Sequence, residues 1–454
     1  MGGDRYQQAL KILDDALVFG IDPSLDGITA LMDKMGNPQN NYPTIHIAGT
    51  NGKSSTTRQI ATMLQAHGYK TGVYVKPHLV EYRERFELEE QVVSKEMFAD
   101  AIIEAKRVAD TLEGMTITEF EIATAAFYQI CDQEKVDVAI VECGMGGRWD
   151  ATSVIHPDVA VVTGIGLDHL GILGDTIEEI AGEKAAIIEE GCKTVLGPGT
   201  QSTLQVFADR VNEVGVKPWL VRCSDDVAAM ESGEGAMQAD ISGYVSYDAD
   251  YGEDPETIKV DVHGMYADYD GIVMRAPLYQ AQNIATAIAA TELYMGHAMD
   301  PDKVRAKFST FTVPGRFETL NQEPLLIIDA AHNPQSAMNL ATAIAKKFPD
   351  GDFQLLLAVL ADKDAHGIIE ALSGLTPDIA VTQTTSPRAL SRLELADMVE
   401  DMTGTRPEVF ESVETALDEL MQRGVPIVAS GSITLAGEVK GVWQKQERQL
   451  SAGL

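Results

Sequence analysis

The stretch that decides the fold is Thr44-Ile45-His46-Ile47-Ala48-Gly49-Thr50-Asn51-Gly52-Lys53-Ser54-Ser55. It starts as a short apolar run, which predicts a buried strand. Gly49 and Gly52 then predict a tight turn, and residues 54–67 resume with the apolar spacing of a helix. A strand, a glycine loop and a helix in this order predict a loop that binds phosphate.

The chemistry of this loop suits phosphate groups. Backbone N–H groups in the loop and at the helix N-terminus form a cradle for an anion. Lys53 adds a positive charge for the outer phosphates, and the Ser54 hydroxyl is a ligand for Mg²⁺. The general form of the motif requires glycine where Ile47 stands, so this loop is a shorter variant. The alternative is a glycine-rich turn in which Ser54 caps the helix, although such a cap does not need Lys53.

The composition limits the classes of function. The chain has 454 residues, enough for two or three domains, and a hydrophobic content of 45% typical of globular proteins. Its net charge of −34 argues against nucleic acid and anionic membranes as partners. No apolar run approaches the length of a membrane span, and the four cysteines are scattered. We therefore expect a cytoplasmic protein with neither a disulfide framework nor a zinc site.

Strand and helix patterns alternate along most of the chain, which predicts an α/β fold. Residues 224–270 are acidic and rich in glycine, and they predict an antiparallel excursion at a sheet edge. Residues 311–317 predict a connection between domains, after which a second α/β series begins. The predicted organisation is a first domain over residues 1–312 with a mostly parallel sheet, and a second domain over residues 313–454.

Two further predicted strands end in side chains that could bind a metal. Glu142 follows the strand of residues 136–141, and His169 lies just beyond the strand of residues 159–162. Functional groups in open α/β sheets gather at the carboxyl ends of strands, so Ser54, Glu142 and His169 could share one divalent ion. The alternatives are a surface acid for Glu142 and a hydrogen-bonded structural histidine for His169, since imidazole is an unusual ligand for Mg²⁺.

Lys184, Asp329 and His332 also admit two interpretations each. Lys184 lies in the middle of a predicted helix over residues 177–190, where it could pair with an acid on a solvated face. Asp329 and His332 follow the first predicted strand of the second domain. They either form a turn before a helix or face a cleft between the domains. Residues 76–86 predict a polar loop.

Several motifs together carry a resemblance to a known family. They are Gly49-Thr-Asn-Gly-Lys-Ser54, Glu142-Cys-Gly-Met-Gly-Gly-Arg-Trp-Asp-Ala-Thr152, Gly166-Leu-Asp-His-Leu170, Gly174-Asp-Thr-Ile-Glu-Glu-Ile-Ala181 with Lys184, Val313-Pro-Gly-Arg316, Asp329-Ala-Ala-His-Asn-Pro334 and Gly431-Ser-Ile-Thr-Leu-Ala-Gly-Glu438. With these motifs in this order, the chain resembles folylpolyglutamate synthase/dihydrofolate synthase of the Mur ligase superfamily. The resemblance runs from about residue 20 to the C-terminus.

The resemblance implies an N-terminal P-loop ATPase domain, a C-terminal Rossmann-like domain and a site between them. The ATP-binding residues that it implies are Gly49, Thr50, Asn51, Gly52, Lys53, Ser54, Asn283, Arg316 and Asp329. The metal ligands that it implies are Ser54, Glu142, His169 and Lys184, the last as a carbamate that supports a second Mg²⁺. The catalytic residues that it implies are Lys53, Lys184 and His332.

The same resemblance bears on the folate. The residues that match the pterin site of dihydrofolate-synthesising members are Thr118, Phe120, Asp150 and Ala151. The alternative for Phe120 is a core residue of the predicted helix 119–133. The chain departs from the family at Lys76, where serine is usual, at Ala330, where glycine is usual, and at Trp149, where a smaller aliphatic residue is common. Lys76 and Trp149 border the substrate loops, so they bear on the choice of folate.

The implied reaction is ATP-dependent ligation of L-glutamate to dihydropteroate, to the γ-carboxylate of a reduced folate, or to both, through an acyl phosphate. We expect a monomer. Two other classes remain open, another ligase of the superfamily acting on a cell-wall precursor, and a nucleotide-binding regulatory protein without turnover. Residues 118–121 and 148–152 favour folates over a cell-wall precursor, and no expected catalytic position is lost.

Overall fold

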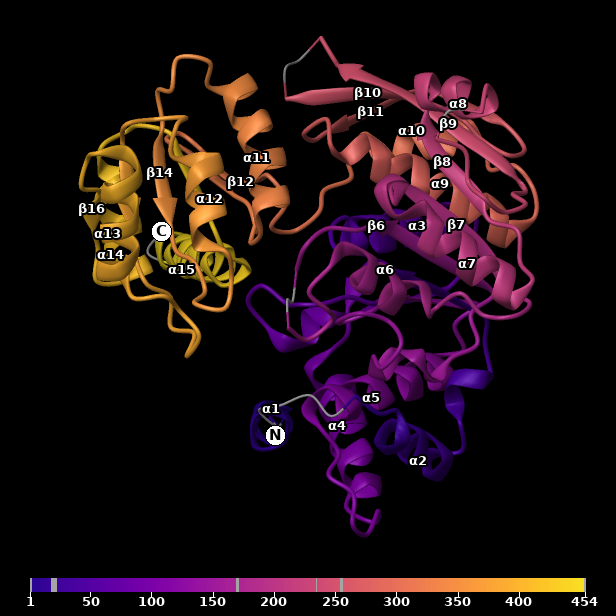
Figure 1. Ribbon diagram of the computed structural model, residues 1–454. Helices are drawn as coiled ribbons and strands as arrows, with labels where there is room; N and C mark the ends of the chain where they lie inside the picture. Colours follow the sequence, from indigo (N-terminus) through magenta and orange to yellow (C-terminus); the bar gives the residue numbers. More distant parts are fainter. Residues whose placement is uncertain (1, 18–22, 169–170, 234, 254–255, 453–454) are drawn as a thin grey trace.

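The computed structural model describes residues 2–17, 23–168, 171–233, 235–253 and 256–452. They form a larger N-terminal body and a smaller C-terminal one, drawn from orange to yellow in Figure 1. Each body has its own sheet. The α/β prediction is therefore confirmed, while the division after residue 312 stays a prediction. No described helix combines the length and apolar character needed to cross a membrane.

The larger sheet has the strand order β11-β10-β9-β8-β7-β6-β1-β5-β2-β3-β4. The strands are β1 (Thr44–Ala48), β2 (Thr71–Tyr74), β3 (Phe86–Leu88), β4 (Gln91–Val92), β5 (Val138–Glu142), β6 (Val159–Gly164), β7 (Lys193–Gly199), β8 (Trp219–Cys223), β9 (Gly243–Tyr251), β10 (Thr257–His263) and β11 (Asp268–Arg275). β1 lies between β5 and β6 and is parallel to both. All of its residues are buried, as its apolar run predicts.

Helices cover both faces of this sheet. They are α1 (Gly2–Asp15), α2 (Asp26–Met35), α3 (Lys53–Ala66), α4 (Lys95–Ala109), α5 (Glu119–Glu134), α6 (Ile177–Ala185), α7 (Leu204–Val214), α8 (Ser224–Glu231), α9 (Gln280–Met295) and α10 (Pro301–Phe308). Side chains of α3, α9 and α10 share one core with Ile45 and Ile47 of β1. The opposite face packs partly against α4 and α5 and partly against α6 and α7.

The acidic region differs in part from its prediction. β9, β10 and β11 form the predicted antiparallel excursion at the sheet edge, but β9 is parallel to β8. Residues 224–231 form the helix α8, which the sequence did not predict. The helix predicted over residues 177–190 ends at Ala185, so Lys184 lies in its last turn. Residues 76–86, predicted as a polar loop, contain a short 3₁₀ turn at Tyr82–Arg85 and the first residue of β3.

The C-terminal body has a six-stranded sheet in the order β12-β13-β17-β14-β15-β16. Its strands are β12 (Glu318–Gln322), β13 (Leu325–Ile328), β14 (Gln354–Leu357), β15 (Ile379–Val381), β16 (Glu408–Val409) and β17 (Ile427–Ser430). Its helices are α11 (Pro334–Lys347), α12 (Ala365–Leu372), α13 (Arg392–Thr403), α14 (Val413–Gln422) and α15 (Ile433–Ala452). The predicted strands β13, β14, β15 and β17 form a parallel centre. The edge strands β12 and β16 were not predicted.

The loop that follows β2 joins the two bodies. Leu79 in this loop packs against the core of the C-terminal body. A Cβ on Gly437 of α15 would stand only 2.1 Å from the Leu79 carbonyl oxygen. Glycine at this position therefore allows the helix backbone to touch the loop. The Glu84 carboxylate holds the loop in shape by accepting N–H bonds from Leu79, Val80 and Glu81.

Candidate active site

The glycine loop between β1 and α3 adopts backbone conformations that glycine favours. Gly49 has φ +149° and Gly52 has φ +87°. A Cβ on Gly49 would lie 2.0 Å from Thr163 Oγ1, and one on Gly52 would lie 2.4 Å from Asn283 Oδ1. The end of β6 and the start of α9 therefore press directly on the loop, and only glycine leaves room for them.

The side chain of Lys53 lies over the glycine loop, and that of Ser54 faces Glu142. Lys53 Nζ donates to the carbonyl oxygens of Gly49 at 2.9 Å and Thr50 at 3.1 Å, so the ammonium lies over the loop. Gly52 is the N-cap of α3, and no side chain caps the helix. The Ser54 hydroxyl instead donates to Glu142 Oε1 at 3.0 Å. The interpretation of Ser54 as a simple helix cap is therefore wrong.

Glu142 is a buried carboxylate at the carboxyl end of β5. Burial raises its pKa, and the positive charge of Lys53 acts in the opposite direction. Its Oε2 accepts from the backbone N–H of Lys76 at 3.3 Å. The surface-acid interpretation is therefore wrong. His169, the third predicted ligand, lies outside the described residues, and within those residues no cluster of three or more acidic, histidine or cysteine side chains could hold a metal.

Lys184 is buried beside the glycine loop. It lines a small cavity together with Lys53, Met145, Asp168 and other loop residues. Burial, followed by the nearby Lys53 charge, lowers its pKa to about 7. The neighbouring Glu183 instead pairs with Arg148 at 2.9 Å. Lys184 is thus not a solvated partner of a helical acid, and that interpretation is wrong.

The C-terminal body contributes polar groups at the carboxyl end of β13. Asp329 is buried, and its Oδ2 accepts from Phe317 N at 2.8 Å and its Oδ1 from Ala331 N at 2.8 Å. Burial raises the pKa of Asp329, and the nearby Arg316 lowers it. His332 Nδ1 donates to the Ala330 carbonyl at 2.9 Å.

Hydrogen bonds and ion pairs join the glycine-loop side of the N-terminal body to the residues after β13 and β14 in the C-terminal body. Asn51 of the glycine loop donates to Gln335 Oε1 at 2.8 Å and accepts from Asn333 Nδ2 at 3.2 Å. Asp168 accepts from Lys363 Nζ at 2.6 Å, and His332 Nε2 lies 3.7 Å from its other oxygen. His332 therefore faces the other body. The sequence did not single out Gln335 or Lys363, because no local pattern links either residue to its partner.

Asn283 also lies against the glycine loop, on the side of α9. It is buried, and its Nδ2 donates to Gln280 Oε1 at 2.9 Å. Gln280 in turn donates to Ser55 Oγ at 3.3 Å. Of the residues predicted to bind ATP, the glycine loop and Asn283 thus touch directly, while Arg316 and Asp329 lie on the C-terminal body.

The residues predicted to bind folate lie at the start of α5 and in the loop after β5. Asp150 is buried and accepts from Met145 N at 2.7 Å and from Thr152 Oγ1 at 2.5 Å. Thr118 caps α5, and its hydroxyl donates to Glu121 at 2.8 Å. Ala151 is buried next to Asp150. These residues shape the loop after β5 and the start of α5, and their role toward folate stays a prediction.

Phe120 is only partly buried, in contact with the core of α4 and α5. Tyr74 lies nearly parallel to it, with ring centroids 6.1 Å apart. The Lys76 ammonium lies 3.7 Å from the centre of the Phe120 ring. Burial, followed by the charge of Arg85, lowers the pKa of Lys76. A cation on an aromatic ring therefore stands within the predicted folate site.

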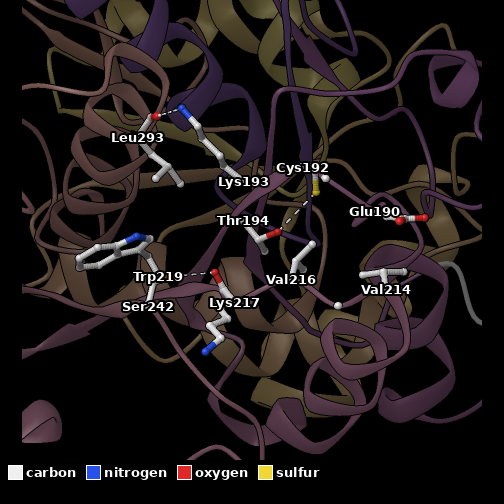
Figure 2. Close-up of a pocket in the computed structure, with 12 residues that line it drawn as sticks. Glu190, Cys192, Lys193, Thr194, Val214, Val216, Lys217, Trp219, Ser242 and Leu293 are labelled. Atoms are coloured by element: carbon white, nitrogen blue, oxygen red, sulfur yellow. Dashed lines mark hydrogen bonds between the residues drawn. The ribbon is translucent and has the colours of Figure 1, made fainter.

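A wider hollow of about 530 Å³ lies elsewhere, around Lys193, Lys217 and Trp219 (Figure 2). It is at the amino ends of β7 and β8, whereas the glycine loop is at the carboxyl end of the parallel strand β1. Lys193 Nζ donates to the Leu293 carbonyl oxygen at 2.8 Å, and Lys217 Nζ forms an ion pair with Asp240 at 3.0 Å. Ligands of parallel sheets bind at the carboxyl edge, so this hollow is not the candidate site.

Comparisons with known proteins agree with this geometry. Residues 47–196 match the Mur ligase middle domain, and residues 315–433 match the Mur ligase, glutamate ligase domain. The dihydrofolate synthase/folylpolyglutamate synthase of Mycobacterium tuberculosis is 36% identical over 421 residues, which cover 88% of this chain and 82% of that protein. The protein of the same name from Bacillus subtilis is 30% identical over 443 residues, which cover 96% of this chain and 98% of that protein.

Solved structures extend the similarity to the fold. Mycobacterium tuberculosis folylpolyglutamate synthase complexed with ADP superposes with a TM-score of 0.88 at 31% identity, covering 98% of this chain and 99% of that one. Escherichia coli FolC in complex with DHPP and ADP gives a TM-score of 0.80 at 27% identity, covering 97% and 98%. The predicted resemblance is confirmed, and the chain belongs to the dihydrofolate synthase/folylpolyglutamate synthase family of the Mur ligases.

Proposed function

We propose that this protein is an ATP-dependent ligase that joins L-glutamate to the carboxylate of a folate-type acceptor. The observation that carries the proposal is the meeting of the glycine loop with the second body, where Asn51 bonds Gln335 and Asn333. A nucleotide held by the loop would present its outer phosphate to this junction. The family to which the chain belongs, with relatives named for this activity, supports the same reaction.

The chemistry requires activation of a carboxylate, which is a poor electrophile. A carboxylate oxygen of the acceptor attacks the γ-phosphorus, the bond from that phosphorus to ADP breaks, and an acyl phosphate forms. The free amine of glutamate then attacks the acyl carbon, phosphate leaves and the amide remains. Lys53 and Arg316 would neutralise and align the anions, and Asp329 and His332 would reach the nucleotide or the incoming glutamate. Contact between the two bodies would exclude water from the acyl phosphate.

The residues at the carboxyl end of β5 suit Mg²⁺. Ser54 Oγ and Glu142 Oε1 lie 3.0 Å apart and are hard oxygen donors, the type that this ion prefers. A buried carboxylate with a raised pKa is also a group that a cation would stabilise in its charged form. Ser54 and Glu142 would hold the ion, with His169 as a further proposed ligand. When bound, Mg²⁺ neutralises charge on the phosphate oxygens.

We also propose that Lys184 carries a carbamate that serves a second Mg²⁺. Only the free amine of a lysine reacts with CO₂, and a pKa of about 7 leaves free amine present at neutral pH. The side chain lines the same cavity as Lys53 and Asp168, so the product would lie beside the phosphate site. The neutral amine nitrogen bonds to the carbon of CO₂ and releases one proton, which turns an uncharged amine into an anionic oxygen ligand.

The acceptor is proposed to be both dihydropteroate and a reduced folate. Dihydropteroate is short, so its pterin must lie deep beside the ATPase domain for its own carboxylate to reach the γ-phosphate. Phe120, Asp150, Thr118 and Ala151 lie in this region, and they offer aromatic and polar contacts for such a ring. We further propose a cytoplasmic location, which suits four cysteines that are all free thiols, and a monomeric state. Light scattering should give a mass near 49.0 kDa.

The test is steady-state turnover with ATP, Mg²⁺ and glutamate, using dihydropteroate in one assay and tetrahydrofolate monoglutamate in another. We expect phosphate release with each, dependent on glutamate. Activity with the tetrahydrofolate acceptor alone would remove the bifunctional proposal. No activity with either folate, but activity with a cell-wall precursor in a third assay, would favour another ligase of the superfamily. Nucleotide binding without turnover would favour a regulatory protein.

A further inference from the structure

Lys76 is a cation without a hydrogen bond or ion pair to its ammonium within the described part of the chain. It follows β2 by two residues and is partly buried, with its Nζ 3.7 Å from the centre of the Phe120 ring. A Cβ on Gly144 would stand 2.9 Å from this Nζ and 2.8 Å from Phe120 Cζ. The ammonium is therefore held closely between the ring and the loop after β5.

The acidic side chains near Lys76 already have other partners. Asp150 accepts from Met145 N and from Thr152, while Glu142 accepts from Ser54 and from the backbone N–H of Lys76 itself. Glu119 pairs with Arg85 at 3.1 Å. An ammonium can donate three hydrogen bonds, and a partly buried one that makes none is costly. This cation is thus available to an anion that enters from outside.

The position of Lys76 identifies that anion. Its backbone binds Glu142, which binds Ser54 of the phosphate loop, and its ammonium touches the aromatic side of the pocket. It therefore stands between the phosphate end and the ring end of the site. In the proposed reaction, the acceptor carboxylate that attacks ATP must pass through the same place, because it has to reach the γ-phosphate while its aromatic part stays near Phe120.

We propose that the Lys76 ammonium binds the reacting carboxylate of the folate-type acceptor, with the Phe120 ring holding the ammonium in place. This inference rests on the proposed function and assigns Lys76 as a residue that recognises the acceptor. Its consequence is a preference for an acceptor with a free carboxylate over the same molecule with that charge removed. The ring of Phe120 then serves as a support for Lys76, beside any contact that it makes with the acceptor.

The experiment compares the binding of pteroate and of pteroate methyl ester to the full-length enzyme in the presence of ADP and Mg²⁺. The two probes differ in the charge of the carboxylate and in one added methyl group. The variants are Lys76→Met, which keeps the length of the side chain, and Lys70→Met as a matched control. Lys70 precedes the other end of β2 and pairs with Glu134 at the surface. Calorimetric titration gives both affinities, and ADP binding reports an intact nucleotide site.

We expect the wild type and Lys70→Met to prefer the acid over the ester, and Lys76→Met to lose about tenfold or more of that preference, the size of one charge-assisted hydrogen bond. The ester and ADP should bind all three proteins alike. An unchanged acid-to-ester ratio in Lys76→Met would overturn the assignment of Lys76 while leaving the proposed function intact. Failure of the wild type to bind pteroate, with ADP still bound, would overturn both.

A second variant tests the role of the ring. Phe120→Leu keeps an apolar side chain but removes the aromatic face beneath the ammonium. We expect it to lower the preference for the acid in the wild-type background and to have no further effect on that preference in Lys76→Met. Equal effects of Phe120→Leu in both backgrounds would contradict the support that we assign to the ring.

Discussion

The contact between α15 and the loop after β2 makes a sharp prediction for Gly437→Ala. An alanine Cβ would lie 2.1 Å from the Leu79 carbonyl oxygen and 2.9 Å from its carbonyl carbon. These are backbone atoms, in a loop that the Glu84 carboxylate holds at three N–H groups, so they cannot turn away as a flexible side chain would. Overpacking of this kind typically costs about 1–3 kcal/mol.

Gly441, one turn further along α15, provides the matched control. A Cβ there would meet only Val80 Cγ1, at an ordinary contact distance of 3.8 Å. Both substitutions gain the same helix propensity, about 1 kcal/mol for alanine over glycine. The difference between the two variants therefore isolates the clash, and Gly437→Ala should be less stable than Gly441→Ala by about 1–3 kcal/mol.

The assay is a thermal melt of each variant, together with kcat/KM for the acceptor and for ATP. Gly437→Ala should melt below Gly441→Ala. If the loop shifts instead, Lys76 moves with it, because it lies three residues before Leu79. The kcat/KM for the acceptor should then fall more than the kcat/KM for ATP. If Gly437→Ala matched Gly441→Ala in both melting temperature and acceptor kinetics, the close contact between the two bodies would be refuted.

Three further predictions concern charge. Circular dichroism should show that Lys53→Ala stays folded, while its turnover should fall by about two orders of magnitude or more, because charge-assisted contacts with phosphate are removed. Near-normal ligation by this variant would exclude the phosphate-loop assignment. Wild-type enzyme under ¹³CO₂ should show a carbamate signal by NMR at pH 8. This signal should shrink below pH 7, because the Lys184 amine has a pKa of about 7 and becomes protonated. A signal of equal size in Lys184→Arg would contradict the assignment of the carbamate to Lys184. The melting temperature should rise between about 10 mM and about 1 M KCl, since salt screens the repulsion that accompanies a net charge of −34, and a flat response would show that this repulsion is not destabilising.

The parts of the fold that follow from local pattern could be predicted from the sequence. The apolar residues 44–48 and the glycines after them specify a buried strand and a tight turn without help from distant residues. The same holds for the centre of the second sheet, where apolar runs bounded by polar loops became β13, β14, β15 and β17. In a parallel sheet, functional side chains gather at the carboxyl ends of the strands, so the location of the candidate site at those ends could also be predicted.

The parts that depend on distant contacts could not be predicted. Residues 76–86 are predicted as a polar loop, and contacts with distant segments, such as that between Leu79 and α15 and that between Arg85 and Glu119, give them a defined shape. Lys184 is buried at the end of α6, where the loop after β5 packs so closely that a Cβ on Gly147 would lie 2.8 Å from the Glu183 carbonyl oxygen. The cation of Lys76 on Phe120 likewise joins two segments that share no sequence pattern.

The central claim is that a folate-type carboxylate is activated by ATP as an acyl phosphate and then joined to glutamate. The most direct measurement uses dihydropteroate with ¹⁸O in its carboxylate, together with ATP, Mg²⁺ and L-glutamate, and follows the label by mass spectrometry. The account predicts that one labelled oxygen appears in the released phosphate and the other stays in the amide of the product, with phosphate release dependent on glutamate. Unlabelled phosphate, released at the same rate without acceptor or glutamate, would contradict it.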